Sequence, residues 1–391
     1  MHAFILIAAL LCATSWTAAA ANETLKIGVI GPMSGPAAQW GVEIARGAEM
    51  KAEEINAAGG LKIGNATYDI RTIPYDHKAN AAEATTVTNR LVFQDKVSYI
   101  VGNSIGATTT AAQTITEPNK VLFLFVSWGK QSLGPQYPYS FRETFSDVEV
   151  VEPFYRWLKE QKKINTVALL DVNDQSGKTT GASMVEAAKA LELKILADEY
   201  FDRALTDFYP LLNRILAMKP DYVDLGSVPP GTAGLLLKQL HEMGYAGTKG
   251  WVSGAILEGA IKIAGPEAAD GLLAPWSANL EGANTPPAVK EIVAKYQKKY
   301  GEPAGNYVVD NYVALDIVTQ AMKAAGTTDT EKVVGHLAGK KFDSAWGPVV
   351  VGGKGTYGVD HQFLRPITIT QYQNGKMVDV GSAMPRDLMV K

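Results

Sequence analysis

The chain has almost no cysteine. Its 391 residues include a single cysteine, Cys12, which lies in an apolar run near the N-terminus. Leu11 precedes it, whereas a lipoprotein leader has a small residue at that position, so we expect no lipid anchor. A mature chain that begins after this run has no thiol, which excludes a disulfide, a thiolate zinc site and a cysteine nucleophile.

Long apolar runs are also missing. The apolar run at residues 4–13 is much shorter than the roughly 20 residues that a membrane-spanning helix needs. Four alanines at residues 18–21 follow it, in the small-residue pattern of a signal peptidase site. Residues 1–21 are therefore predicted to be a signal peptide, and the mature chain is predicted to lie in the periplasm.

Neither charge sign dominates the chain. It carries 37 basic and 40 acidic residues, a net charge of −3, and no basic run. Nucleic acid is therefore not expected as a partner.

Sequence motifs for metals and cofactors are absent too. The five histidines have no metal-binding spacing, and Gly177-Lys178-Thr179 lacks the earlier glycine of a phosphate-binding loop. Gly28-Val29-Ile30-Gly31 is not a dinucleotide fingerprint. We expect no metal and no cofactor.

A regular alternation of strand and helix patterns fills the chain. A first series ends near Arg142, and a second begins directly after it. Continuous apolar runs, such as residues 121–126, suit parallel strands buried on both faces. Strands are expected at 25–30, 68–73, 97–101, 121–126, 166–170, 194–200, 221–226 and 249–253, followed by a β-rich tail at 349–380. Helices are expected at 40–57, 79–93, 107–116, 148–161, 178–191, 207–218, 231–243, 287–300 and 307–325. The pattern predicts the α/β class with two parallel sheets, in keeping with a length that exceeds one core.

Aromatic residues lie near several predicted strand ends. Ligands bind beyond the carboxyl ends of strands in such sheets. Trp40, Trp128 and Trp251 lie at or just after strand ends, and Tyr307 begins a helix. Packing explains any one of them equally well, but the set predicts a shared apolar cleft.

The segment Gly102-Asn103-Ser104-Ile105-Gly106 permits two interpretations. It fits the G-x-S-x-G pattern of a hydrolase nucleophile between a strand and a helix, and His241, His336 and His361 follow it. A serine hydrolase using Ser104 is therefore a remote alternative. The favoured interpretation is a turn rich in Gly and Thr whose backbone N–H groups bind a carboxylate at a helix N-terminus.

Two blocks carry a family resemblance. Residues 28–36, followed by Gln39-Trp40-Gly41, and residues 47–60 resemble the opening of the branched-chain amino-acid-binding (leucine/isoleucine/valine-type) periplasmic receptors. The resemblance continues at residues 75–76, 101–102, 219–223 and 301–303, and it covers nearly the whole mature chain.

The resemblance implies a fold and a role. The fold is two Rossmann-like lobes joined by a three-segment hinge, the type I periplasmic binding protein fold. The N-terminal lobe would hold 24–142 plus 277–347, and the C-terminal lobe 143–276 plus 348–391. The implied protein is a monomer that delivers a small ligand to the membrane permease of an ABC importer and is not an enzyme. A receptor that serves a sensory kinase would share the same pocket.

The resemblance also places a pocket. With the aromatic positions, the expected ligand-binding residues are Trp40, Ile105, Gly106, Ala107, Thr108, Ser127, Trp128, Ser176, Val228, Trp251, Ser253 and Tyr307. The acid that pairs with an amino acid's ammonium in the family falls near Ser253, and residues 250–256 contain no acid. A buried ammonium without a counter-charge is costly, so we expect an aromatic or hydrophobic carboxylate. An amino acid remains the alternative if Asp171, Asp174 or Glu258 supplies the charge.

Overall fold

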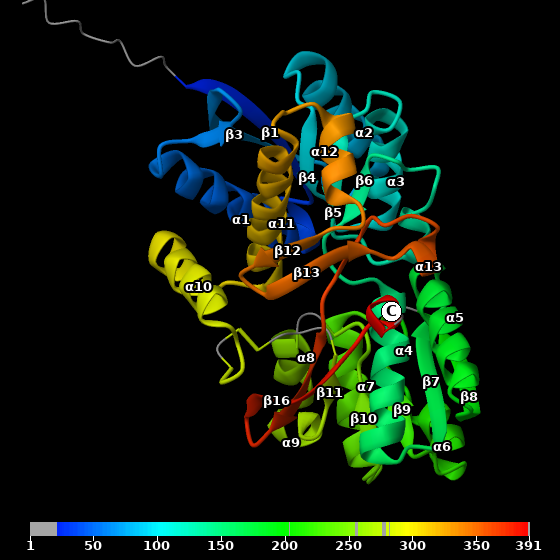
Figure 1. Ribbon diagram of the computed structural model, residues 1–391. Coiled ribbons are helices and arrows are strands. Elements are labelled where there is room, and N and C mark those ends of the chain that lie inside the picture. Colours follow the sequence, from blue (N-terminus) through cyan, green and yellow to red (C-terminus); the bar gives the residue numbers. More distant parts are fainter. Residues whose placement is uncertain (1–21, 203, 255–256, 276–278, 281, 390–391) are drawn as a thin grey trace, which may run out of the picture.

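The computed structural model describes residues 22–389 except 203, 255–256, 276–278 and 281. The chain forms two lobes, one above the other in Figure 1, each built on a twisted sheet. The predicted signal peptide, residues 1–21, lies outside the described residues.

The first sheet belongs to the upper lobe. Its strand order among the described residues is β12-β13-β14-β6-β5-β4-β1-β3-β2, and the pairs from β14 to β3 are parallel. Strand β5 is buried along its whole length, as its continuous apolar sequence predicts. The strands are β1 (Glu23–Gly31), β2 (Leu61–Ile63), β3 (Ala66–Asp76), β4 (Tyr99–Gly102), β5 (Leu122–Phe125), β6 (Ser140–Arg142), β12 (Lys341–Ser344), β13 (Gly347–Gly352) and β14 (Gln362–Leu364).

The second sheet belongs to the lower lobe. Its order is β16-β15-β11-β10-β9-β7-β8, parallel from β8 to β11 and antiparallel at β15 and β16. The strands are β7 (Thr166–Val172), β8 (Lys194–Phe201), β9 (Tyr222–Asp224), β10 (Thr248–Gly250), β11 (Leu273–Ala274), β15 (Ile367–Gln373) and β16 (Lys376–Ala383).

Helices cover both faces of each sheet, and each face has its own apolar core. The upper lobe contains α1 (Ala38–Ala57), α2 (Ala81–Asn89), α3 (Gly106–Thr116), α10 (Pro287–Tyr300), α11 (Asn306–Ala325), α12 (Thr330–Leu337) and α13 (Lys354–Tyr357). The lower lobe contains α4 (Asp147–Trp157), α5 (Gln175–Ala190), α6 (Tyr209–Ala217), α7 (Pro230–Glu242), α8 (Leu257–Ala264) and α9 (Pro266–Ala269). The last helix, α14 (Arg386–Met389), touches α4 and α13 where the lobes meet.

The chain passes between the two sheets three times. It crosses after β6, returns between β11 and α10, and crosses again between β14 and β15. The predicted α/β class with two Rossmann-like lobes is confirmed. The helices that were not among those predicted are α8, α9, α12, α13 and α14.

One segment differs from the expected lobe boundaries. Strands β13 and β14 pair with the first sheet, although residues from 348 onward were expected in the C-terminal lobe. The reason is a tight hairpin: Ser344 pairs with Gly347, so β13 folds directly back on β12 and stays in the same sheet. The third crossing therefore falls at residues 365–366.

No helix in the described part of the chain is long and apolar enough to cross a membrane. The same residues contain no cluster of three or more histidine, cysteine or acidic side chains that could hold a metal ion.

Candidate ligand-binding site

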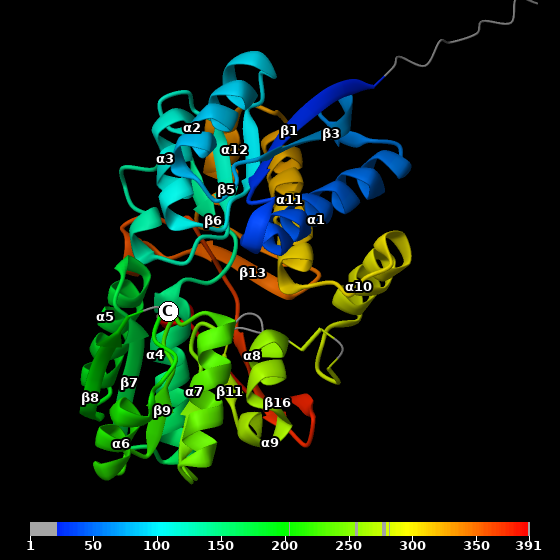
Figure 2. The same cartoon turned by 180° about the vertical axis from the view of Figure 1, so that it is seen from behind.

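Several of the predicted site residues follow the carboxyl ends of parallel strands, and one of these strand ends reaches the other lobe. Trp128, in the loop after β5, provides the direct evidence. Its indole N–H donates to the Thr180 hydroxyl of α5 at 3.2 Å, and its ring packs against the core of the lower lobe. A loop at the strand ends of the upper lobe therefore touches α5 of the lower lobe. Figure 2 shows one end of α5 directed toward the upper lobe.

The turn between β4 and α3 has an unusual backbone. Gly102 and Asn103 both have positive φ, at 108° and 78°. A Cβ on Gly102 would lie 2.4 Å from the Ile30 carbonyl oxygen, so only glycine fits there. This turn ends β4 abruptly and aims the first turn of α3 away from the sheet.

A buried network holds Asn103 in one orientation. The backbone N–H of Ala79 donates to His77 Nδ1 at 3.1 Å, so His77 Nε2 carries the proton and donates to Asn103 Oδ1 at 3.0 Å. Thr108 Oγ1 donates to the same oxygen at 2.5 Å. Burial lowers the pKa of His77, which keeps the ring neutral. The Asn103 amide nitrogen is therefore left as a donor, and it has no partner among the residues that the structure describes.

The N-terminal end of α3 collects further donors. Ile105 caps the helix without a side-chain hydrogen bond, and the buried Ser104 hydroxyl has no partner in the described part of the chain. A Cβ on Gly106 would meet no atom within 4 Å, so there is space directly at the helix end. The first N–H groups of a helix have no partner within the helix and favour anions. This end of α3 can therefore bind a carboxylate.

Two predicted aromatic residues belong to α1 and α11 of the upper lobe. Trp40 is half-buried in the first turn of α1, and Tyr307 is half-buried at the start of α11. Glu43, one turn after Trp40, accepts a hydrogen bond from the Tyr307 backbone N–H. Burial raises the pKa of Glu43 to about 7. The shared contact fixes the starts of α1 and α11 side by side.

Serines gather at the strand ends of the lower lobe. Ser227 follows β9 and donates from its hydroxyl to Asp171 Oδ1 at 2.9 Å. The Ser176 hydroxyl lies 3.3 Å from that of Ser227, and Ser253 donates to the Gly226 carbonyl oxygen at 2.8 Å. We name Ser176, Ser227 and Ser253 the serine wall.

Asp171 lies beneath the serine wall. Its Oδ1 accepts from the backbone and hydroxyl of Ser227, while Oδ2 is buried without a partner. Burial raises the pKa of Asp171 to about 7. Asp174 has a different role from Asp171, because its carboxylate caps α5 by accepting a hydrogen bond from the Gly177 N–H. The side chain of Glu258 lies outside the described part of the structure.

Three predicted residues point into protein cores. Ser127 is fully buried, and its hydroxyl donates to Ser132. Val228 and Trp251 are 3% and 2% exposed and pack within the core of the lower lobe. Their contact with a ligand stays a prediction, as it does for the whole predicted set.

The Ser104 hydroxyl has no histidine partner in the described structure. His77 is bonded to Asn103, and His361 lies against the Ser140 carbonyl oxygen. His336 is exposed and bonded within its own helix. A serine nucleophile needs a base within hydrogen-bonding distance, so the arrangement does not favour the hydrolase alternative.

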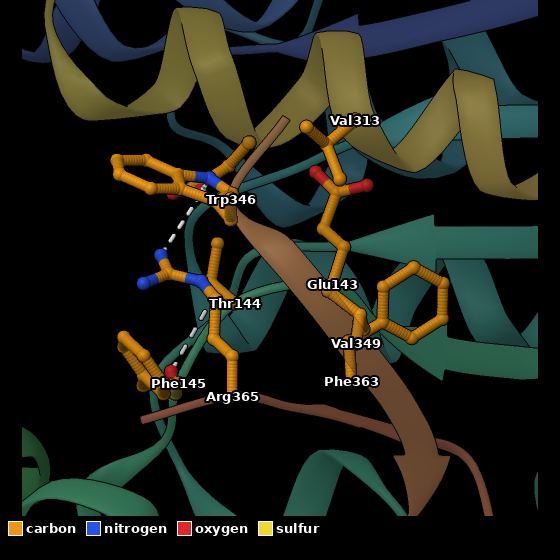
Figure 3. Close-up of a pocket in the computed structure, with 9 residues that line it drawn as sticks. Glu143, Thr144, Phe145, Val313, Trp346, Val349, Phe363 and Arg365 are labelled. Atoms are coloured by element: carbon orange, nitrogen blue, oxygen red, sulfur yellow. Dashed lines mark hydrogen bonds and ion pairs between the residues drawn. The ribbon is translucent and has the colours of Figure 1, made fainter. Parts of the chain in front are cut away.

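A buried cluster at the crossings was missed from sequence (Figure 3). Arg365 pairs with Asp310 at 3.1 Å, and its guanidinium lies between the rings of Phe145 and Trp346, 4.4 and 4.3 Å from their centroids. Glu143 points toward Val313 instead, and neither of its carboxylate oxygens has a partner. Burial raises its pKa well above the usual value. The cluster encloses a cavity of about 10 Å³, the size of one water molecule.

A second cavity of about 650 Å³ lies at the lobe junction, lined by α4, α5, β13, α13 and α14. None of the predicted ligand-binding residues lines it or the small cavity.

Comparison with known proteins gives a consistent result. Residues 24–376 match the family described as periplasmic binding protein. A leucine-, isoleucine-, valine-, threonine- and alanine-binding protein from Pseudomonas aeruginosa is 27% identical, over 86% of this chain and 87% of that protein.

Solved structures agree on the fold. A branched-chain amino acid binding protein from Streptococcus pneumoniae, in complex with isoleucine, has a TM-score of 0.74 and 26% identity, covering 93% of this chain and 99% of the other. A solute-binding protein from Rhodopseudomonas palustris, in complex with 3,4-dihydroxybenzoic acid, has a TM-score of 0.74 and 24% identity, with coverage of 93% and 98%.

Proposed function

Because the chain belongs to the periplasmic binding protein family, we propose that it is an exported receptor that delivers a small organic ligand to the membrane permease of an ABC importer. The receptor works as a monomer and carries out no reaction of its own. Its signal peptide, residues 1–21, is removed on export to the periplasm.

The ligand is an aromatic or hydrophobic carboxylate. The observation that carries this proposal is the set of donors without partners at the start of α3: the Asn103 amide, the Ser104 hydroxyl and the first backbone N–H groups. Buried donors without partners cost about 1–3 kcal/mol each, so a ligand that supplies acceptors gains that energy. A carboxylate has two acceptor oxygens and the charge that a helix N-terminus favours.

The lower lobe supports a ligand that has no amino group. By the resemblance the family's acid falls near Ser253, and the Ser253 hydroxyl donates to the Gly226 carbonyl oxygen. The half-buried rings of Trp40, Trp128 and Tyr307 suit a flat apolar body between the two ends. The residues proposed to bind the ligand are therefore those predicted from the sequence, together with Asn103 and Ser104.

Binding would work by closure of the two lobes. The ligand contacts both lobes and stabilises a closed form, in which the Trp128–Thr180 hydrogen bond joins them. The closed receptor then docks on the permease.

Branched-chain amino acids are the second candidate. The relatives with 26–27% identity carry such ligands in their names. Asp171 has one carboxylate oxygen without a partner at the end of β7, where an ammonium could pair with it. This observation keeps the alternative open to test.

A thermal-shift titration of the mature protein, stripped of bound ligand, separates the candidates. Benzoate and phenylacetate are compared with leucine and isoleucine. A ligand at 100 times its Kd should add roughly 2.7 kcal/mol of stability. Stabilisation by the carboxylates alone supports the proposal, whereas stabilisation by leucine or isoleucine alone overturns it.

A pair of glycine variants tests the position of the carboxylate. Gly106→Ala adds a methyl group at the end of α3, and Gly335→Ala adds one in α12; neither methyl group would touch a protein atom within 4 Å. Both variants should fold normally, but only Gly106→Ala should weaken carboxylate binding, by about tenfold for a contact worth roughly 1.4 kcal/mol. Equal affinities in both variants would place the ligand elsewhere.

A further inference from the structure

The hydrogen-bond directions in the serine wall restrict what the ligand presents to the lower lobe. Ser227 gives its only hydroxyl proton to Asp171, so it can offer only lone pairs to its other neighbours. The contact of 3.3 Å between Ser176 and Ser227 must then be donated by Ser176. The three groups form a directed chain from Ser176 through Ser227 to Asp171.

Ser253 follows the same rule. Its proton goes to the Gly226 carbonyl oxygen at 2.8 Å, which leaves only lone pairs on the oxygen. Ser227 and Ser253 belong to the loops after β9 and β10 and are half-buried, whereas Ser176 lies in the first turn of α5, after β7, and is exposed. The lower lobe therefore offers acceptors, whereas the α3 end of the upper lobe offers donors.

The backbone conformation around Gly226 fixes the direction of the hydrogen bonds that the serines donate. Gly226 has φ of 57°, and a Cβ there would lie 2.4 Å from the Leu170 carbonyl oxygen and 2.6 Å from Asp171 Oδ2. The turn brings the Ser227 N–H to 3.2 Å from Asp171 Oδ1, so that this oxygen receives both donors of Ser227. The serine protons cannot turn outward without leaving Asp171 Oδ1 with fewer donors.

The wall offers no exposed charge to the ligand. The acid lies under the serines and is 1% exposed, and only the uncharged hydroxyls reach the surface. Because burial raises the pKa of Asp171 to about 7, the acid is partly neutral near that pH. An uncharged donor matches this surface better than an ammonium, which would need a full counter-charge.

We infer that the ligand is a carboxylate with a neutral hydrogen-bond donor at its far end, such as the hydroxyl of a hydroxylated aromatic acid. The carboxylate accepts from the start of α3, and the hydroxyl donates to the serine wall. This inference rests on the proposed function and narrows its ligand class, and it makes Ser227 and Ser253 specificity-determining residues.

Calorimetric titration of the mature protein with four ligands tests the inference. Benzoate has no donor, 3- and 4-hydroxybenzoate have one, and 4-methoxybenzoate has similar size but cannot donate. At least one hydroxybenzoate should bind roughly tenfold or more tightly than benzoate and 4-methoxybenzoate, as sites built for a ligand hydroxyl discriminate strongly. Equal binding of all four overturns this inference but leaves the proposed function intact, whereas the proposed function itself fails if none of the four binds while leucine does.

Three variants complete the test. Ser227→Ala and Ser253→Ala should each reduce the ratio of the hydroxybenzoate affinity to the benzoate affinity. Ser98→Ala, at an exposed position before β4, is the control and should preserve this ratio. An unchanged ratio in both serine-wall variants would contradict the inference, and thermal unfolding of each variant shows whether it is folded.

Discussion

At the scale of single residues, two buried acids in one cluster, Asp310 and Glu143, differ in whether other side chains donate hydrogen bonds to them. Asp310 receives hydrogen bonds from Trp346 and Arg365, at 2.9 and 3.1 Å. Glu143 receives none, and it is surrounded by Val313, Val349 and Phe363 in the same small cavity. Asp310 is thus a compensated charge, and Glu143 is a buried polar group that lowers the stability of the fold.

The two acids therefore predict opposite mutational effects. Glu143→Met should raise the free energy of unfolding by about 1 kcal/mol or more, because a polar group without a partner costs about 1–3 kcal/mol. Asp310→Asn should lower it by about 3–5 kcal/mol, because Arg365 would be left buried without a counter-charge. Urea unfolding of both variants at pH 7 measures the difference, and a destabilised Glu143→Met would show that its carboxyl has a partner, such as a buried water.

At the scale of structural elements, the start of α4 is tied to the upper lobe. Ser146 and Glu149 form a capping box at the first crossing between the lobes. The Tyr357 hydroxyl from α13 donates to Glu149 Oε1 at 2.7 Å and accepts from Arg142 at 3.1 Å. A side chain of the upper lobe, Tyr357, therefore helps to fix the capped start of a helix in the lower lobe.

Removal of the Tyr357 hydroxyl tests this tie. Tyr357→Phe should lower the free energy of unfolding by about 1–3 kcal/mol, because buried partners lose their hydrogen bonds. Tyr139→Phe is the matched control: its hydroxyl contacts Glu331 at the surface, and its loss should change stability by less than about 0.5 kcal/mol. Thermal unfolding of both variants gives the comparison, and equal losses would mean that the tie adds nothing.

At the scale of the whole molecule, buried acids link stability to pH. Burial raises the pKa of Glu43 and Asp171 to about 7, and that of Asp224 in the same direction. For such a group the folded state binds more protons than the unfolded state between the two pKa values. Its contribution to stability therefore falls as pH rises through that window. His77 and His361 act in the opposite direction, because their pKa values are lowered.

Glu43→Gln isolates one of these effects. Its pKa is about 4.5 in the unfolded chain and about 7 in the fold, so the penalty for ionising it develops between these values. The stability of the variant relative to the natural protein should rise from pH 4.5 to pH 8 by about 3 kcal/mol, at about 1.4 kcal/mol per pKa unit. Unfolding free energies measured across this range test the prediction, and a constant difference would show that the fold does not raise the pKa of Glu43.

Sequence patterns predicted most of this architecture, because strand and helix periodicity depends on local burial. Strands β1, β3, β4 and β5 and the long helices α1, α5, α10 and α11 lie close to where they were expected. The placement of β13 failed, because sheet membership depends on a hairpin partner rather than on the strand's own residues. The short strands β2 and β6 and the helices α8, α9, α12, α13 and α14 were overlooked.

The site could be predicted only in part. The α3 turn carries a readable signal in its glycines and threonines, and the missing acid at Ser253 is visible in the sequence. The importance of Asn103 and Asp171 is not, because each depends on partners far away in the chain, His77 and Ser227. Glu143 and Arg365 gave no signal, since their cluster exists only where two crossings meet α11.

The contact between Trp128 and Thr180 gives the protein an optical probe of its own. The indole is half-buried against the core of the lower lobe, and its N–H is bonded across the lobes at 3.2 Å. Separation of the lobes would expose the ring to water and shift its fluorescence to longer wavelengths. The movement that loads and empties this receptor can thus be followed in the unlabelled protein, with Trp128→Phe showing which part of the emission comes from the junction.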